Sequence, residues 1–140
     1  MADVKICWVV KAIVVNVWGR CLLLRRSEKN KRFVGQWEWP GGKMETRENP
    51  STSLHRELRE ETGFEADITS YVGTASFETE DTGVRYVVIC MEVALTEGTL
   101  AISHDHDAAE WVGFSEFSKY PLVEKVRGFM LHYAAKRQSF

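Results

Sequence analysis

Cysteine is scarce in this sequence, and its distribution does not suggest a disulfide-stabilised protein. Three cysteines, an odd number, are spread over 140 residues without a CxxC pair. We therefore expect free thiols in a reducing compartment. An excess of basic residues is also absent, because the net charge is −2. This argues against a nucleic acid polymer as a partner, whereas a small anionic ligand is compatible if metal ions neutralise it.

Long hydrophobic runs are absent too. The longest apolar stretch runs from Ile6 to Val17, and Lys11 and Asn16 interrupt it. This stretch is too short to cross a bilayer, so we expect no membrane partner. No positively charged leader with a small-residue cleavage site is present either, and we therefore expect a cytoplasmic protein.

The residues that are present predict one globular domain over positions 1–140, because no repeat, linker or low-complexity tract divides the chain. Apolar residues make up 44% and charged residues 27% of the sequence, as is usual for globular domains. Stretches rich in β-branched residues predict strands at 4–17, 21–26, 66–77, 84–95 and 110–114. Loops are predicted at 27–36 and 97–107, and a final amphipathic helix at about 122–136.

The strongest helix signal lies in the middle of the chain. Asn49 suits the N-cap, Pro50 suits the first helical position, and Gly63 suits the C-terminal stop. The residues between them are mostly good helix formers, so a helix is predicted from Pro50 to Thr62. Strands before and after a central helix, with another helix at the end, predict a mixed sheet covered by helices.

Three carboxylates share one face of this predicted helix. Glu57 and Glu61 are separated by one helical turn, and Glu60 lies between them. Such like charges repel one another unless a cation is present, and Mg²⁺ prefers oxygen ligands of this kind. In isolation the triplet is more typical of a solvated acidic helix face than of a metal site.

The surrounding spacing resembles the Nudix box. After Gly42 come five residues and Glu48, and then seven residues and the segment Arg-Glu-Leu-Arg-Glu-Glu-Thr-Gly-Phe at 56–64. The sequence matches all nine fixed positions of the box over 23 residues. The segment Gln-Trp-Glu-Trp-Pro-Gly-Gly-Lys-Met-Glu at 36–45 is similar to the entry to the box in MutT-like members.

This resemblance implies a Nudix-type α/β/α sandwich with a mixed β-sheet, and hydrolysis of a nucleoside diphosphate linked to another group. It also implies bound Mg²⁺, with Mn²⁺ as an alternative. The implied metal ligands are the carboxylates of the helix and one backbone carbonyl of the glycine turn, namely Glu57, Glu60, Glu61 and Gly41. Arg56 is implied as a catalytic-site residue that forms a supporting charge pair with Glu48.

The general base is left open between three carboxylates. Glu60 shares the ligand face, and Asp105 falls where MutT-like members often have a loop glutamate. Asp107 is close enough in the sequence to compete with Asp105. His104 and His106 lie in the same loop, where we expect solvated side chains rather than a separate zinc site.

Other residues are candidates for substrate contacts. Arg26 is a candidate for binding the phosphates, because a guanidinium pairs phosphate oxygens bidentately. For Trp37 and Trp39 the sequence leaves two roles open, namely stacking on a base and packing in the core. The loop at 27–36 has a basic excess that would steer an anion toward the site.

The expected substrate is a small nucleotide, most specifically a nucleoside triphosphate cleaved to the monophosphate and pyrophosphate. No proline occurs between Pro50 and Pro121, so the marker of many ADP-ribose hydrolases is absent. Many dinucleoside polyphosphate hydrolases have a tyrosine about sixteen residues beyond the box, where this sequence has Glu80, Asp81 and Thr82. The coenzyme A pattern is only partly matched. The segment 120–124 also lacks the asparagine with which MutT-like enzymes can bind a purine. One alternative is a hydrolase of another diphosphate, such as ADP-ribose or coenzyme A. The other is a non-catalytic Nudix-fold nucleotide-binding or regulatory domain, which the intact glutamate set disfavours.

Overall fold

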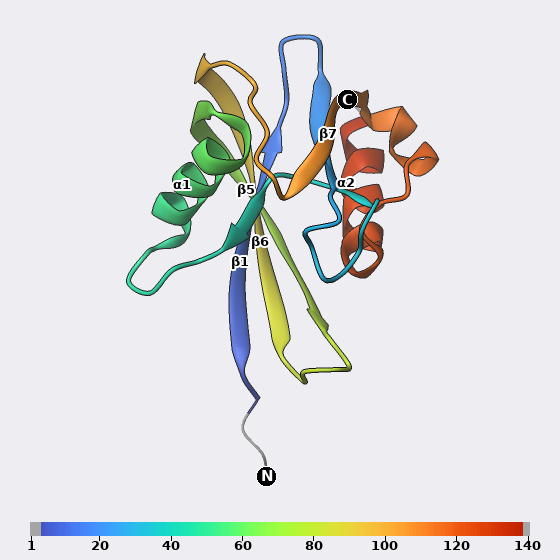
Figure 1. Cartoon of the computed structure of the whole chain (residues 1–140). Helices are drawn as coiled ribbons and strands as arrows, with labels where there is room; N and C mark the ends of the chain where they lie inside the picture. The colour runs from blue at the N-terminus through green and yellow to red at the C-terminus, as the bar shows by residue number, and fades with distance from the viewer. Residues whose placement is uncertain (1–3, 139–140) are drawn as a thin grey trace.

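A computed structural model describes residues 4–138 and shows an α/β/α sandwich (Figure 1). Its strands are β1 (Ile6–Val14), β2 (Arg20–Arg26), β3 (Trp37–Glu38), β4 (Gly41–Lys43), β5 (Phe64–Glu78), β6 (Arg85–Gly98) and β7 (His106–Gly113). Its helices are α1 (Pro50–Thr62), the 3₁₀ segments η1 (Phe114–Lys119) and η2 (Glu124–Val126), and α2 (Arg127–Gln138). The two α-helices lie on opposite sides of the strands (Figure 1).

The strands form two sheets. A four-stranded mixed sheet has the order β4-β1-β6-β5, in which β1 is parallel to β6 and antiparallel to β4. An antiparallel three-stranded sheet has the order β3-β2-β7. Alternate residues of β1 and β2 therefore contribute to two hydrophobic cores, one beneath α1 and the other beneath α2. Leu54 and Leu58 of α1 are buried in the first core.

The predicted boundaries of α1 are confirmed. The Asn49 side chain accepts a hydrogen bond from the Thr52 N–H at 2.8 Å, and Pro50 is the first helical residue. Gly63 has a left-handed backbone with φ of 78°, and its N–H bonds the Arg59 carbonyl at 3.0 Å. These local caps hold the carboxylate face of α1 against β4, the strand formed by the glycine turn.

The chain after β7 differs from the prediction. The final helix begins at Arg127 rather than near Leu122. Leu122 is extended and forms an isolated parallel bridge with Trp37, and the Trp37 N–H bonds the Pro121 carbonyl at 2.9 Å. This pairing buries Leu122 in the core, which local helix propensity could not indicate. The predicted loop at 97–107 is also shorter, because β6 continues to Gly98 and β7 begins at His106.

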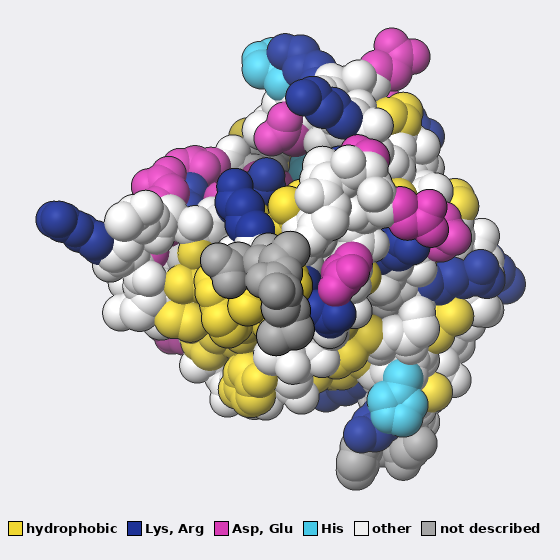
Figure 2. All heavy atoms as spheres, turned by 90° about the horizontal axis from the view of Figure 1, so that it is seen from below, with side chains coloured by type: hydrophobic (Ala, Val, Ile, Leu, Met, Phe, Trp, Pro, Cys, Tyr) yellow, Lys and Arg dark blue, Asp and Glu magenta, His cyan; other side chains and the backbone are white. Residues whose placement is uncertain are grey.

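One face of the molecule shows how charge is distributed on its surface. Acidic and basic side chains are interspersed there, and hydrophobic side chains gather in one place among them (Figure 2). Ile6 and Trp8, at the start of β1, are each 49% exposed. Within residues 4–138, no helix is long and apolar enough to cross a membrane.

Candidate active site

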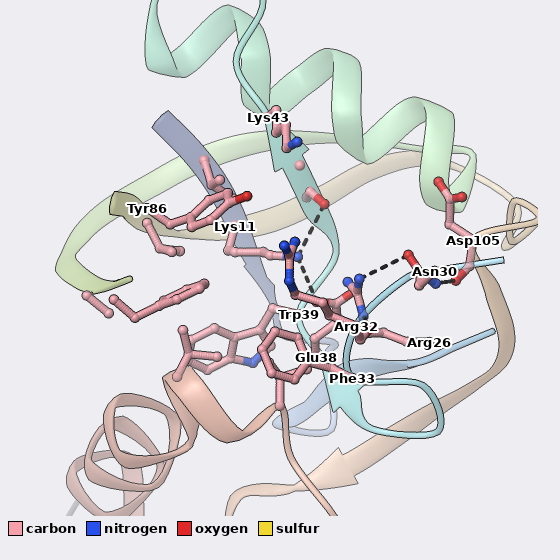
Figure 3. Close-up of a pocket in the computed structure, with 18 of the residues that line it drawn as sticks. Lys11, Arg26, Asn30, Arg32, Phe33, Glu38, Trp39, Lys43, Tyr86 and Asp105 are labelled. Atoms are coloured by element: carbon pink, nitrogen blue, oxygen red, sulfur yellow. Dashed lines mark hydrogen bonds and ion pairs between the residues drawn. The ribbon is translucent and has the colours of Figure 1, made fainter. Parts of the chain in front are cut away.

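A cavity of about 490 Å³ opens between the glycine turn, α1, and the strands β1, β5 and β6 (Figure 3). Charged side chains line the cavity, among them Lys11, Arg26, Glu38, Glu57 and Glu61. Apolar and aromatic side chains line it as well, among them Phe77, Tyr86, Val88, Phe129 and Met130. The cavity therefore offers groups suited to charge and others suited to a flat apolar group.

Glu61 is the most deeply buried carboxylate of the α1 face. Only 6% of the residue is exposed. Its Oε1 accepts a hydrogen bond from the Gly41 N–H at 3.1 Å, whereas its buried Oε2 has no hydrogen-bond partner. Burial raises the pKa of Glu61 from 4.5 to about 8. An unpartnered buried carboxylate oxygen is costly unless a proton or a cation binds it.

Gly41 and Gly42 allow the backbone of the turn to lie close to β1 and to the carboxylates of α1. Gly41 has φ of +143°, and a Cβ there would lie 2.0 Å from the Val10 carbonyl oxygen. A Cβ on Gly42 would lie 2.6 Å from a carboxylate oxygen of Glu57. The Glu57 carboxylate is thus packed directly against the backbone of the glycine turn. Glu57 is half-buried, and burial raises the pKa of its carboxyl group.

Arg56 organises the carboxylates at the outer end of the site. It forms two hydrogen bonds with Glu48, at 2.6 Å and 2.8 Å, which confirms the predicted charge pair. Its Nη1 lies 3.1 Å from an oxygen of Glu57 and 3.1 Å from an oxygen of Glu60. The Glu60 side chain is 57% exposed and does not line the cavity. Arg56 therefore holds Glu57 and Glu60 in place while leaving Glu61 to the interior.

This donor set fits a hard divalent cation. Glu61, whose Oε2 has no hydrogen-bond partner, lines the cavity together with Glu57 and Gly41. Among residues 4–138, however, no group of three or more His, Cys, Asp or Glu side chains is already arranged to hold a metal ion. Glu57 and Glu60 are instead paired with the Arg56 guanidinium. A metal ion would have to draw these carboxylates toward Glu61.

A buried polar network adjoins this site, and the sequence analysis missed most of it. Glu38 is 5% exposed and accepts from Lys11 at 3.1 Å, Arg26 at 2.9 Å and His106 at 2.8 Å. Burial alone would raise the pKa of Glu38, but these three partners hold it at about 2. The lysine within an otherwise apolar strand was the only sequence signal for this network.

The prediction of a solvated His106 is wrong. His106 is 5% exposed, and its second ring nitrogen, Nδ1, lies 3.5 Å from the unpartnered Oε2 of Glu61. His106 is the first residue of β7, and the pairing of this strand with β2 turns the imidazole inward. The imidazole therefore lies between Glu38 and Glu61, two carboxylates that are far apart in the sequence. His104, by contrast, is exposed as expected.

Arg26 lines the cavity, but its guanidinium already has partners. It donates to Glu38 at 2.9 Å, to the Asn30 side chain at 3.0 Å and to the Arg32 carbonyl at 3.0 Å. A phosphate would therefore have to share or replace these bonds. Trp37 and Trp39 are buried at 6% and 2% exposure, so both belong to the core, although Trp39 also forms part of the cavity wall.

The structure separates the two loop aspartates. Asp105 lines the cavity, and its backbone carbonyl accepts hydrogen bonds from the Ser27 N–H and the Asn30 side chain (Figure 3). Asp107 is absent from the cavity lining and pairs instead with Arg25 at 2.7 Å on the surface. Of these two candidates for the general base, only Asp105 therefore faces the same cavity as Glu57 and Glu61.

An α/β/α sandwich in which a capped helix sets a row of glutamates against a glycine turn has the architecture of a Nudix hydrolase. The profile of the NUDIX domain matches residues 6–133, so the chain belongs to the Nudix family. Together with its curated relatives, this match identifies a MutT-like Nudix pyrophosphohydrolase.

Relatives and solved structures agree with this assignment. The chain is 37% identical over 114 residues to a CTP pyrophosphohydrolase of Escherichia coli, covering 81% of this chain and 82% of that protein. It is 28% identical to an 8-oxo-dGTP diphosphatase of Proteus vulgaris, over 74% of this chain and 96% of that protein. The crystal structure of a MutT protein from Methanosarcina mazei has a TM-score of 0.86 at 26% identity, and each chain is covered completely.

Proposed function

We propose that this protein hydrolyses a nucleoside triphosphate to the monophosphate and pyrophosphate in the presence of Mg²⁺, with Mn²⁺ as a substitute. The observation that best supports this proposal is that carboxylates and basic side chains line the same cavity as aromatic ones. The charged groups suit a metal-bound diphosphate, and the aromatic groups suit a base. CTP is the first candidate, because the relative at 37% identity is named a CTP pyrophosphohydrolase.

Glu57, Glu60, Glu61 and the Gly41 carbonyl are the proposed metal ligands. The bound ion would neutralise the diphosphate, orient it and make water a better nucleophile. Arg56, held by its two bonds to Glu48, would leave Glu57 and Glu60 available to hold the ion. Arg26 exchanges part of its present bonding for phosphate oxygens, for which a guanidinium is well suited. Phe77 and Tyr86, stacked with centroids 5.1 Å apart, form an apolar wall against which a base can lie.

Asp105 is the proposed general base. We expect Asp105→Asn to slow turnover by about 100-fold, because an amide cannot accept the proton of the attacking water. Metal affinity should stay close to that of the parent, since Asp105 is not among the proposed ligands. The measurements are kcat at saturating nucleotide and the Mn²⁺ dissociation constant of the free protein. Asp107→Asn is made in parallel. A parent-like rate for Asp105→Asn would move the assignment to Glu60, or to Asp107 if that variant is slow.

A side-by-side substrate panel tests the proposed function. Standard and oxidised nucleoside triphosphates, ADP-ribose, a dinucleoside polyphosphate and coenzyme A are incubated with the protein and Mg²⁺. We expect a triphosphate, with CTP first, to give the highest kcat/KM and to release pyrophosphate rather than phosphate. Preferential cleavage of ADP-ribose, the dinucleotide or coenzyme A would contradict the proposal. Comparing CTP with UTP and GTP tests the choice of base separately.

A further inference from the structure

Lys11 places a cation at the centre of the candidate active site. It lies in β1, an otherwise apolar strand, and its side chain is 14% exposed. Its Nζ donates to Glu38 Oε1 at 3.1 Å and to the Gly41 carbonyl at 3.2 Å (Figure 3). A lysine is rarely buried to this extent without a specific partner. Here one of the two partners is the carbonyl that we propose as a metal ligand.

The Lys11 ammonium can donate one further hydrogen bond. Lysine carries three N–H donors, and Glu38 and Gly41 account for two of them. The side chain lines the cavity together with Glu57 and Glu61. The charge of Lys11 also acts on both of these carboxyls, in opposition to the effect of their burial. Lys11 is therefore close to the metal ligands and faces the space that the diphosphate would fill.

A metal ion and this ammonium are competitors for the same carbonyl. Both are cations, so each destabilises the other at short range, and the low polarity of a partly buried site increases the effect. Glu38 does not require Lys11 alone for its neutralisation, because Arg26 and His106 also donate to it. Lys11 can thus leave Gly41 without leaving Glu38 unpartnered.

We propose that Lys11 is a second cation of the active site, which gives up the Gly41 carbonyl to the metal ion and binds an oxygen of the substrate diphosphate. The ammonium keeps its proton throughout and acts by charge and hydrogen bonding. This role rests on the proposed function for the identity of the anion, but not for the competition between Lys11 and the metal ion. It gives the diphosphate a fixed positive charge in addition to the metal and Arg26.

The proposal predicts two effects of opposite sign for Lys11→Met. Without nucleotide, Mn²⁺ should bind about tenfold more tightly, because a competing positive charge is removed. With Mg²⁺ present, binding of the non-hydrolysable probe α,β-methylene-CTP should weaken about tenfold, because a charge-assisted hydrogen bond is lost. Electron paramagnetic resonance measures free Mn²⁺, and calorimetry measures the nucleotide probe. Lys136→Met is the matched control, since it removes the same charge from an exposed position of α2.

Opposite signs distinguish this role from a structural one. A lysine that only supports the fold would, when replaced, lower the melting temperature and weaken both metal and probe binding. That result, or Mn²⁺ affinity equal to that of the parent, would overturn the proposal. Lys11→Gln is measured as well, so that a folding defect of the methionine variant does not decide the outcome. If the parent binds no triphosphate probe, the proposed function fails, while the nucleotide-free Mn²⁺ measurement still tests the competition.

Discussion

Glu57→Gln and Glu61→Gln are each expected to reduce kcat by about two to four orders of magnitude while the fold survives. Glutamine keeps the size and nearly the helix propensity of glutamate, so α1 should be unaffected. It removes the negative charge that a hard divalent cation requires. A poorly held ion neither activates water nor neutralises the diphosphate, and several kcal/mol of transition-state stabilisation should be lost.

For Glu61 the structure also predicts how the substitution affects thermal stability. Burial raises the pKa of this carboxyl group to about 8, so much of the metal-free protein already holds it in the neutral form at pH 7. A neutral glutamine should therefore leave the metal-free melting temperature unchanged or slightly higher. The gain in melting temperature that Mg²⁺ gives the parent should be reduced or abolished, because this gain comes from binding to the folded state.

Two measurements test the expected effects of Glu57→Gln and Glu61→Gln. The first is kcat as a function of Mg²⁺ concentration at saturating nucleotide, and the second is thermal unfolding with and without Mg²⁺. If α1 only presents a solvated acidic face, both variants will match the parent in rate and in metal requirement. Such a result would end the assignment of the metal ligands.

Replacing the two glycines of the turn by alanine should produce two different defects. Gly41→Ala should lower the stability of the fold by about 3 kcal/mol or more, because its backbone conformation is unsuited to a side chain. The new Cβ would also lie 2.0 Å from the backbone oxygen of Val10, which cannot move without disturbing the β1–β4 pairing. Gly42→Ala should mainly reduce activity, because its Cβ would meet the movable carboxylate of Glu57 at 2.6 Å.

Gly128→Ala is the matched control for both glycine variants. Gly128 lies in α2, and a Cβ at this position has no heavy atom within 4 Å. Alanine there should be neutral or slightly stabilising, because it favours the helix. Chemical unfolding and kcat are measured for all three variants. Equal stability of Gly41→Ala and the parent, or a fully active Gly42→Ala, would show that the close approaches at this turn do not matter.

Features that depend on contacts between neighbouring residues could be predicted from the amino-acid sequence. Asn49, Pro50 and Gly63 fix the two ends of α1, because capping involves hydrogen bonds over only a few positions. The helical repeat then places Glu57 and Glu61 on one side without any knowledge of the fold. The pair between Arg56 and Glu48 could also be predicted, although only through the resemblance to the Nudix box.

The tertiary structure decided which side chains meet across the sheets. Lys11 comes from β1 of the four-stranded sheet, whereas Glu38 and His106 come from β3 and β7 of the three-stranded sheet, so the three meet only because the two sheets pack together. In the sequence each is an isolated polar residue, because the hydrogen bonds that would explain it are made to residues 27 to 68 positions away. Burial is decided in the same way, since the cores on both faces of the sheets form only when distant segments pack. The carboxylates of the candidate site could thus be proposed from the sequence, whereas only the fold placed a lysine and a histidine beside them.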